Sequence, residues 1–140
     1  MQNGVLHQPV NGRYLDVNGV RLYVQETGTG PELIFLHGWT LDHRMWKRQA
    51  GPLGTHFHVI ALDRRGFGRS SDVPDLAREP DDIAGLMELF GMEGAILCAA
   101  SQAGRVALRF ALSHPARIRA LVLQGSALDG MPEPVDDPGF

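Results

Sequence analysis

Cysteine is almost absent from this sequence, as are the features that would mark it as secreted or membrane-bound. With Cys98 as its one cysteine, the chain forms neither an internal disulfide nor a cysteine-based structural zinc site. No apolar run approaches the about 18 residues of a transmembrane helix. The first residues lack the basic and apolar regions of a secretory signal peptide. We therefore expect a cytoplasmic location, no membrane partner and no metal.

An excess of basic charge is also lacking, as are phosphate-binding motifs. A net charge of −3 argues against a nucleic-acid partner, because neutralising phosphates needs a basic surface. The arginines at positions 64, 65 and 69 lie between Asp63 and Asp72, a pattern that we interpret as a solvated turn. No G-x-x-x-x-G-K-[ST] motif occurs, and residues 28–30 precede a predicted strand instead of following one, as a dinucleotide fingerprint would. No cofactor is expected.

The hydrophobic pattern is that of a single α/β domain. Two alternating runs, 14–17 and 20–24, are joined by Asn18-Gly19 and predict a hairpin, because both turn positions need positive φ. Four continuous apolar runs follow, as expected for parallel strands that are buried on both faces. These runs cover residues 33–36, 59–62, 95–97 and 121–123.

Amphipathic stretches separate the four apolar runs. Asp42 is a candidate cap for a helix up to about residue 53, a second helix begins at residues 80–82, and a third covers residues 103–114. The order is a hairpin followed by β-α-β-α-β-α-β. This order predicts an α/β three-layer sandwich with a mostly parallel sheet, preceded by an antiparallel N-terminal hairpin.

Three motifs follow three of the predicted strands, at the sheet edge where open parallel sheets carry their catalytic groups. They are His37-Gly38-Trp39, residues 63–70 (DRRGFGRS) and residues 99–104 (AASQAG). Together and in this order they resemble the α/β-hydrolase family, in its serine-nucleophile branch. The resemblance extends from Tyr14 to Leu128. It implies a truncated core, the N-terminal half only, which lacks the last strands and the cap.

Ser101 is the candidate nucleophile. A sharp turn from strand to helix would lift its hydroxyl clear of the backbone and aim the next N–H groups at the same point; an ordinary helix N-cap is the alternative. The resemblance implies an oxyanion hole formed by the backbone N–H groups of Trp39 and Gln102. Ala99 and Ala103 replace the glycines usual beside the nucleophile. Residues implied as structural support are His37, Gly38, Asp63, Gly66, Gly68 and Gly104.

The acid and the histidine of a catalytic triad are not evident. The family order is serine, acid, histidine, yet the one later histidine, His114, lies 13 residues after Ser101. On a helix this is roughly 20 Å, too far to reach the hydroxyl. Asp129 follows the last predicted strand and is a candidate acid, with a plain loop carboxylate as the alternative.

Two hypotheses about function remain open. The first is a serine hydrolase acting on a small-molecule ester, lactone or related carbonyl through Ser101, inactive as this chain alone. Ser101 argues against the dehalogenase and epoxide-hydrolase branches, which use aspartate there. The second is a non-catalytic half-domain that serves as a binding or assembly module.

The sequence also predicts how the chain is organised and what it associates with. Residues 1–128 would form the partial core, and the Pro-rich loop 129–140 would begin the missing cap region. The strand at 121–123 would be an exposed edge. We therefore expect a dimer or a complementing C-terminal polypeptide.

Overall fold

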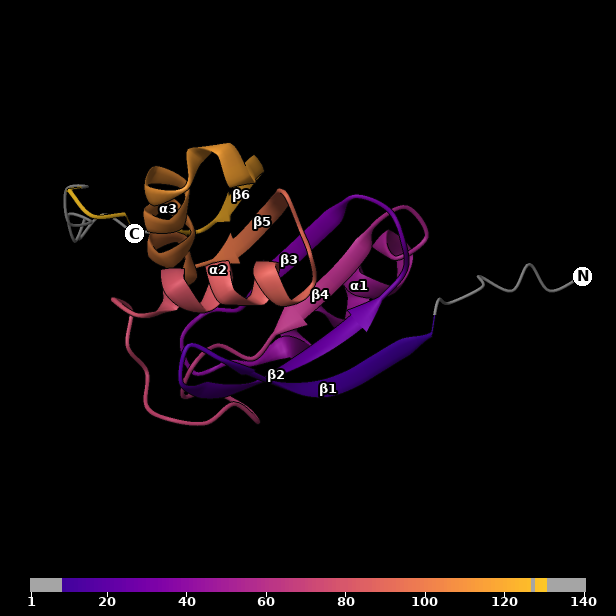
Figure 1. The fold of residues 1–140 in the computed structure, drawn as a ribbon, viewed down its shortest axis with the longest axis horizontal. Helices are drawn as coiled ribbons and strands as arrows, with labels where there is room; N and C mark the ends of the chain where they lie inside the picture. The colour runs from indigo at the N-terminus through magenta and orange to yellow at the C-terminus, as the bar shows by residue number, and fades with distance from the viewer. Residues whose placement is uncertain (1–8, 127, 131–140) are drawn as a thin grey trace, which may run out of the picture.

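The fold is built on a six-stranded mixed sheet. In the computed structural model, which describes residues 9–126 and 128–130, the strand order is β1-β2-β4-β3-β5-β6 (Figure 1). The strands are β1 (Val10–Val17), β2 (Val20–Thr27), β3 (Glu32–Leu36), β4 (His58–Leu62), β5 (Ala95–Ala100) and β6 (Ile118–Gln124). The α/β class, the hairpin and the four later strands are confirmed.

The N-terminal hairpin joins the parallel part of the sheet through β2. Asn18 and Gly19 both have positive φ, 50° and 73°, as the two-residue turn requires. β2 pairs antiparallel with β1 on one side and with β4 on the other. β3, β4, β5 and β6 run parallel to one another. The carboxyl ends of β3, β4 and β5 therefore lie at the same end of the sheet, and the three motifs follow them there.

Helices cover both faces of the sheet. α2 and α3 lie on one face and α1 on the other (Figure 1). The helix predicted after Asp42 is split into a 3₁₀ turn and a short α-helix, and the Asp42 side chain caps it by accepting from the Arg44 N–H. The bounds are η1 (His43–Trp46), α1 (Lys47–Leu53), α2 (Glu79–Leu89), α3 (Ala103–Ser113) and η2 (Pro115–Arg117). Within the described residues, none of these helices is long and apolar enough to cross a bilayer.

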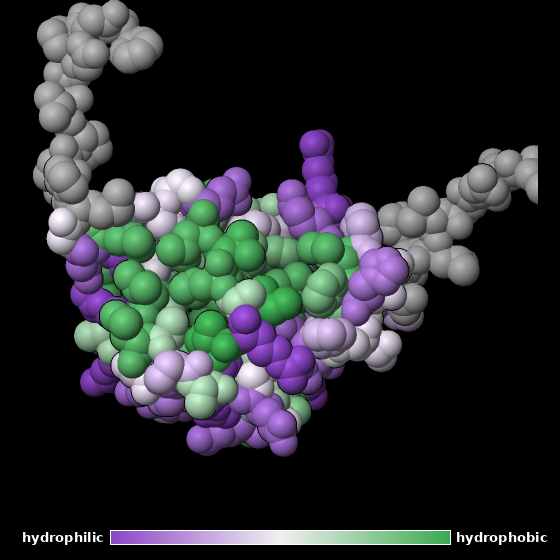
Figure 2. Space-filling model, turned by 90° about the horizontal axis from the view of Figure 1, so that it is seen from above, coloured by the Kyte–Doolittle hydropathy of each residue, from purple (hydrophilic) through white to green (hydrophobic). Residues whose placement is uncertain are grey.

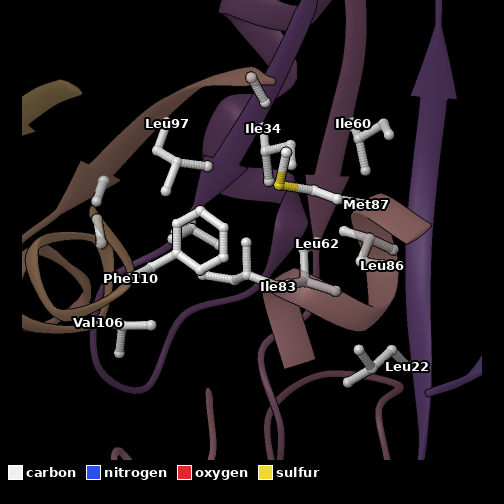
Figure 3. Packing of buried hydrophobic residues seen from close by; sticks show 14 of the residues in the cluster. Leu22, Ile34, Ile60, Leu62, Ile83, Leu86, Met87, Leu97, Val106 and Phe110 are labelled. Carbon is white, nitrogen blue, oxygen red and sulfur yellow. The ribbon is translucent and has the colours of Figure 1, made fainter. Parts of the chain in front are cut away.

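The larger hydrophobic cluster lies between the sheet and the pair α2–α3. Alternate residues of β3, β4 and β5 point toward it, as the period of two in a strand requires (Figure 3). Phe110 of α3 and Met87 of α2 close it from the helix side. This packing fixes α3 on the sheet and thereby the turn that precedes it.

β6 forms one edge of the sheet and is the most exposed of the parallel strands. Val122 is 48% exposed and Leu123 37%, although the run is as apolar as the buried strands. Figure 2 shows a broad hydrophobic surface on the side where β6 lies in Figure 1. The exposed edge predicted from the sequence is therefore present.

Candidate active site

Ser101 stands at an abrupt turn between β5 and α3. Its φ is +52°, in the left-handed region that costs an L-residue about 1–2 kcal/mol. Its N–H donates to the Gln124 carbonyl of β6 at 2.8 Å, and its side chain is exposed. The cap position of α3 is Gln102. An ordinary N-cap has an extended backbone, which the left-handed φ of Ser101 does not match.

Ala99 and Ala103 fit into the turn. Both are fully buried and belong to the larger hydrophobic cluster. Ala99 pairs with Leu36 of β3 on one side and with Leu123 of β6 on the other. The strand-turn-helix bend thus forms with alanine on both sides of Ser101.

The loop of residues 37–39 lies directly against this bend. A Cβ added at Gly38 would lie 3.4 Å from the Ser101 Cβ and 3.7 Å from the Ala100 carbonyl oxygen. Glycine therefore permits the close approach of the loop to the Ser101 side chain. The exposed Trp39 ring contacts Phe67 edge-on, with centroids 5.5 Å apart. The structure brings together the segments that carry both candidate oxyanion donors.

His37 is buried and hydrogen-bonded through both ring nitrogens. Its Nε2 accepts from the Arg64 N–H at 2.9 Å, so its Nδ1 carries the proton and donates to the Gly38 carbonyl at 2.8 Å. Burial lowers the pKa of His37 from 6.5 to about 4, so the ring is neutral at physiological pH. With both nitrogens engaged, His37 holds the loop and has no free nitrogen to deprotonate Ser101.

Lowering the pH should destabilise the fold through His37. Because its pKa falls from 6.5 to about 4 on folding, the unfolded chain binds the proton more tightly. The contribution is present above pH 6.5 and is lost as the pH falls toward 4, about 3 kcal/mol in all. Urea unfolding at a series of pH values should show this loss in the wild type, and the free energy of unfolding should depend less steeply on pH in His37→Asn. An equal pH dependence in the two proteins would contradict the lowered pKa of His37.

Asp63 is fully buried and organises the loop after β4. Its Oδ1 accepts from the N–H and the ring Nδ1 of His43, at 2.6 and 2.8 Å, and its Oδ2 accepts from the Arg69 N–H at 2.9 Å. Gly68 is required beside it, because its φ is +54° and an added Cβ would lie 2.3 Å from the Asp63 Oδ2. Gly66, with φ +82°, packs equally closely on the backbone at Pro74.

The interpretation of residues 63–72 as a solvated turn is wrong for Arg64 and Arg65, although Arg69 and Asp72 are exposed. The Arg64 and Arg65 side chains are 0% and 1% exposed. Arg64 donates from Nε and Nη2 to the Glu79 carboxylate at 2.7 and 3.0 Å, and Arg65 makes the equivalent pair with Asp82 at 2.9 and 2.7 Å. Both acids lie at the start of α2, three residues apart and so about one helical turn from each other. This spacing is the one signal in the sequence for the two arginine–carboxylate pairs.

Asp129 and Gly104 both lie against neighbours that the segment after β6 and α3 bring together. The Asp129 carboxylate accepts from the Arg109 Nη2 at 2.8 Å and lies 3.8 Å from the Arg105 Nε, both on α3. It is exposed, which fits the alternative of a loop carboxylate. Gly104 allows Ser126 to approach α3, since an added Cβ would meet the Ser126 Oγ at 2.2 Å. The rest of the predicted loop 129–140, from residue 131 on, lies outside the described residues.

Across the described ranges, no histidine is hydrogen-bonded to the Ser101 hydroxyl. The His114 ring stacks on Phe110 with centroids 4.8 Å apart, and the His58 Nε2 donates to the Glu26 carboxylate at 2.8 Å. His43 is bound to Asp63, as above, and His7 lies outside the described residues. The described part of the chain thus brings the candidate nucleophile and the segments of the two candidate donors together, but it pairs no histidine with the Ser101 hydroxyl.

One cluster contains the residue types that bind a cation, but its ligand atoms are already engaged in hydrogen bonds. Ligand atoms of Asp42, His43 and Asp63 lie within 4.8 Å of one another. However, both Asp42 oxygens accept from the Arg44 guanidinium, and Asp63 accepts from the donors described above. Two cavities, of about 660 and 420 Å³, lie beside Trp46 and are not lined by Ser101. Neither feature adds to the chemistry at the turn.

The chain belongs to the α/β-hydrolase fold family, whose sequence model matches residues 31–139. It is 36% identical over 114 residues to the AB hydrolase superfamily protein YisY of Bacillus subtilis, covering 77% of this chain and 42% of that protein. It is 33% identical over 110 residues to a pimeloyl-[acyl-carrier protein] methyl ester esterase of Nitrosospira multiformis, covering 74% and 41%.

A solved structure supports the same assignment. An epoxide hydrolase variant from Vigna radiata superposes with a TM-score of 0.80 at 27% identity, covering 86% of this chain and 40% of that one. The chain thus spans about two fifths of the length of the relatives that it matches. The esterase and the epoxide hydrolase are named for different reactions, so membership of the family does not by itself specify the reaction.

Proposed function

We propose that Ser101 is the nucleophile of a serine hydrolase acting on an ester, a lactone or a related carbonyl compound. The observation that carries this proposal is the backbone of Ser101: an exposed, non-glycine residue in a left-handed conformation between strand and helix. Such conformations cost free energy and persist where the fold enforces them, often at sites of chemistry. The histidine belongs to the part of the fold that this chain does not span. A cytoplasmic location stays a prediction.

The geometry suits acyl transfer. A base takes the Ser101 proton as Oγ attacks the carbonyl carbon, and the carbonyl oxygen becomes an oxyanion. The N–H groups of Trp39 and Gln102 would donate to that oxygen, and the N-terminus of α3 would favour its negative charge. The tetrahedral intermediate then expels the alcohol, and water hydrolyses the acyl-serine.

Ester hydrolysis fits Ser101 better than the reactions of the epoxide hydrolase and dehalogenase branches. A serine that attacked the sp³ carbon of an epoxide or an alkyl halide would form an ether, which water does not cleave under these conditions. An aspartate in the same place forms an ester instead, which can be hydrolysed. Ser101 therefore supports attack on an sp² carbonyl carbon.

A fluorophosphonate probe tests the proposal. We expect Ser101 to be labelled in the product of the complete reading frame if that product supplies a downstream histidine, and Ser101→Ala to abolish the labelling. The 140-residue chain alone should label very slowly. A folded product that carries such a histidine but leaves Ser101 unlabelled would overturn the proposal. Rapid labelling of the chain alone would show that a base within it had been overlooked.

The exposed edge favours a second function, as an assembly module. β6 offers unpaired backbone groups and apolar side chains to a further parallel strand. Beside it, the cavity of about 420 Å³ has an apolar lining on the α1 face. It is lined in part by Leu33, Phe35, Ile96 and Val122. If the reading frame ended at Phe140, the non-catalytic module, completed by a second polypeptide or a second copy, would be the function we propose.

The isolated chain should therefore self-associate through β6. Val122→Lys places a charge on the edge and should shift sedimentation velocity profiles toward monomer. Leu112→Lys is the matched control, because Leu112 is 74% exposed on α3 and lies off the edge. A wild-type chain that is monomeric and unfolds cooperatively would contradict this prediction.

A further inference from the structure

One buried arginine contacts both segments that carry the candidate oxyanion donors. The Arg64 Nη1 donates to the His37 carbonyl at 3.0 Å, and its Nη2 donates to the Gln102 side-chain oxygen at 3.1 Å. We infer that Arg64, held by Glu79, is a positioning residue that fixes the loop 37–39 against the turn at Ser101. This inference rests on the proposed function of Ser101.

Arg64 holds His37 at two points, and both act on the loop that carries the Trp39 N–H. Its guanidinium binds the His37 carbonyl, next to Gly38 in the chain. Its backbone N–H, which any substitution except proline keeps, donates to the His37 Nε2 and so leaves the proton on Nδ1, which donates to the Gly38 carbonyl. That carbonyl and the Trp39 N–H belong to one planar peptide group, in which they point in opposite directions. Fixing the carbonyl therefore fixes the direction of the Trp39 N–H.

The contact with Gln102 acts on the other donor. Gln102 is the first residue after Ser101, and its own backbone N–H is the second candidate donor. Its side chain is tied to a guanidinium that also binds the His37 carbonyl. A single planar group thus spans the space between the loop and the turn, and a movement of either segment would break one of its hydrogen bonds.

Glu79 keeps the guanidinium in place. Its two carboxylate oxygens accept from Nε and Nη2 of Arg64 at 2.7 and 3.0 Å, and its side chain is almost fully buried. The pair compensates the buried charge and sets the plane of the guanidinium. A lysine could not replace Arg64, because one ammonium group cannot reach Glu79, His37 and Gln102 in this geometry.

Arg65 provides a matched control in the same loop. It is as buried as Arg64, and it is paired with a carboxylate of the same helix, Asp82. Its other described hydrogen bonds go to Asp72 and to the Asn18 carbonyl, away from both donor segments. Substituting either arginine should therefore lower the stability. Only a substitution of Arg64 should also affect the amides of Trp39 and Gln102.

The experiment compares Arg64→Lys with Arg65→Lys by two readouts. In ¹⁵N-labelled chain, Arg64→Lys should shift the amide resonances of Trp39 and Gln102, because both segments lose a hydrogen bond to the guanidinium. In the complete reading-frame product, the same variant should label with fluorophosphonate about tenfold more slowly, as expected for the loss of a charged hydrogen bond. Arg65→Lys should leave both amides and the labelling rate unchanged.

A second variant keeps the test decisive if Arg64→Lys does not fold. Gln102→Met retains the backbone N–H and removes only the contact with Arg64, so it should shift the Gln102 amide and slow labelling by a smaller factor. Unchanged amides in these variants would overturn the positioning role. If the wild type itself is not labelled, the proposed function fails. The shifts of the Trp39 and Gln102 amide resonances then still test the positioning role of Arg64 independently.

Discussion

Trp39→Pro should slow acylation of Ser101 by about 10²–10³-fold. Proline has no backbone N–H, so the substitution removes one of the two candidate oxyanion donors without touching the nucleophile. The measurement is the fluorophosphonate labelling rate in the complete reading-frame product. Trp39→Ala is the matched control, because it removes the exposed ring, which contacts Phe67, but keeps the N–H.

The two variants separate the roles of the Trp39 backbone and side chain. The preceding residue is Gly38, which tolerates the extended conformation that a following proline favours. The fold should therefore accept the change, which circular dichroism would verify. Equal losses in Trp39→Pro and Trp39→Ala would assign the effect to the ring and remove this N–H from the oxyanion hole.

Arg65→Met should destabilise the chain by about 3–5 kcal/mol, because it leaves the Asp82 carboxylate buried without its partner. Arg65 donates twice to Asp82 and also to the Asn18 carbonyl, so one side chain joins α2 to the N-terminal hairpin. The free energy of unfolding in urea gives the measurement.

Two further variants test the cause of that loss. The double variant Arg65→Met/Asp82→Leu should recover much of the stability, because no buried charge is left unpaired. Arg44→Met should change the stability by less than about 1 kcal/mol, because the Arg44–Asp42 pair is at the surface and the Arg44 side chain is 79% exposed. A double variant as unstable as Arg65→Met would show that packing, not the unpaired charge, dominates.

The strands, the hairpin and the order of the motifs could be predicted because their signals are local. Asn18-Gly19 specifies its turn by the φ angles it can adopt, and continuous apolar runs specify strands buried on both faces. The position of the bend at Ser101 followed from the order strand, serine, helix. The left-handed φ of Ser101 did not, because it results from anchoring Ser101 to β6 and α3 to the sheet.

The buried arginines were missed because their partners are distant in the sequence. Arg64 pairs with Glu79 and Arg65 with Asp82, 15 and 17 residues later. The nearer acids, Asp63 and Asp72, suggested local neutralisation in solvent. Asp63 instead turns inward to accept from backbone N–H groups and from His43. Formal charges close together in sequence do not indicate which groups the fold brings together.

The most direct test of the oxyanion geometry is a crystal structure of the phosphonylated protein, obtained from the complete reading-frame product. The account predicts phosphorus bonded to the Ser101 Oγ, with the phosphoryl oxygen about 2.7–3.1 Å from the backbone nitrogens of both Trp39 and Gln102. An adduct on another residue, or a phosphoryl oxygen turned to solvent away from these two nitrogens, would contradict it.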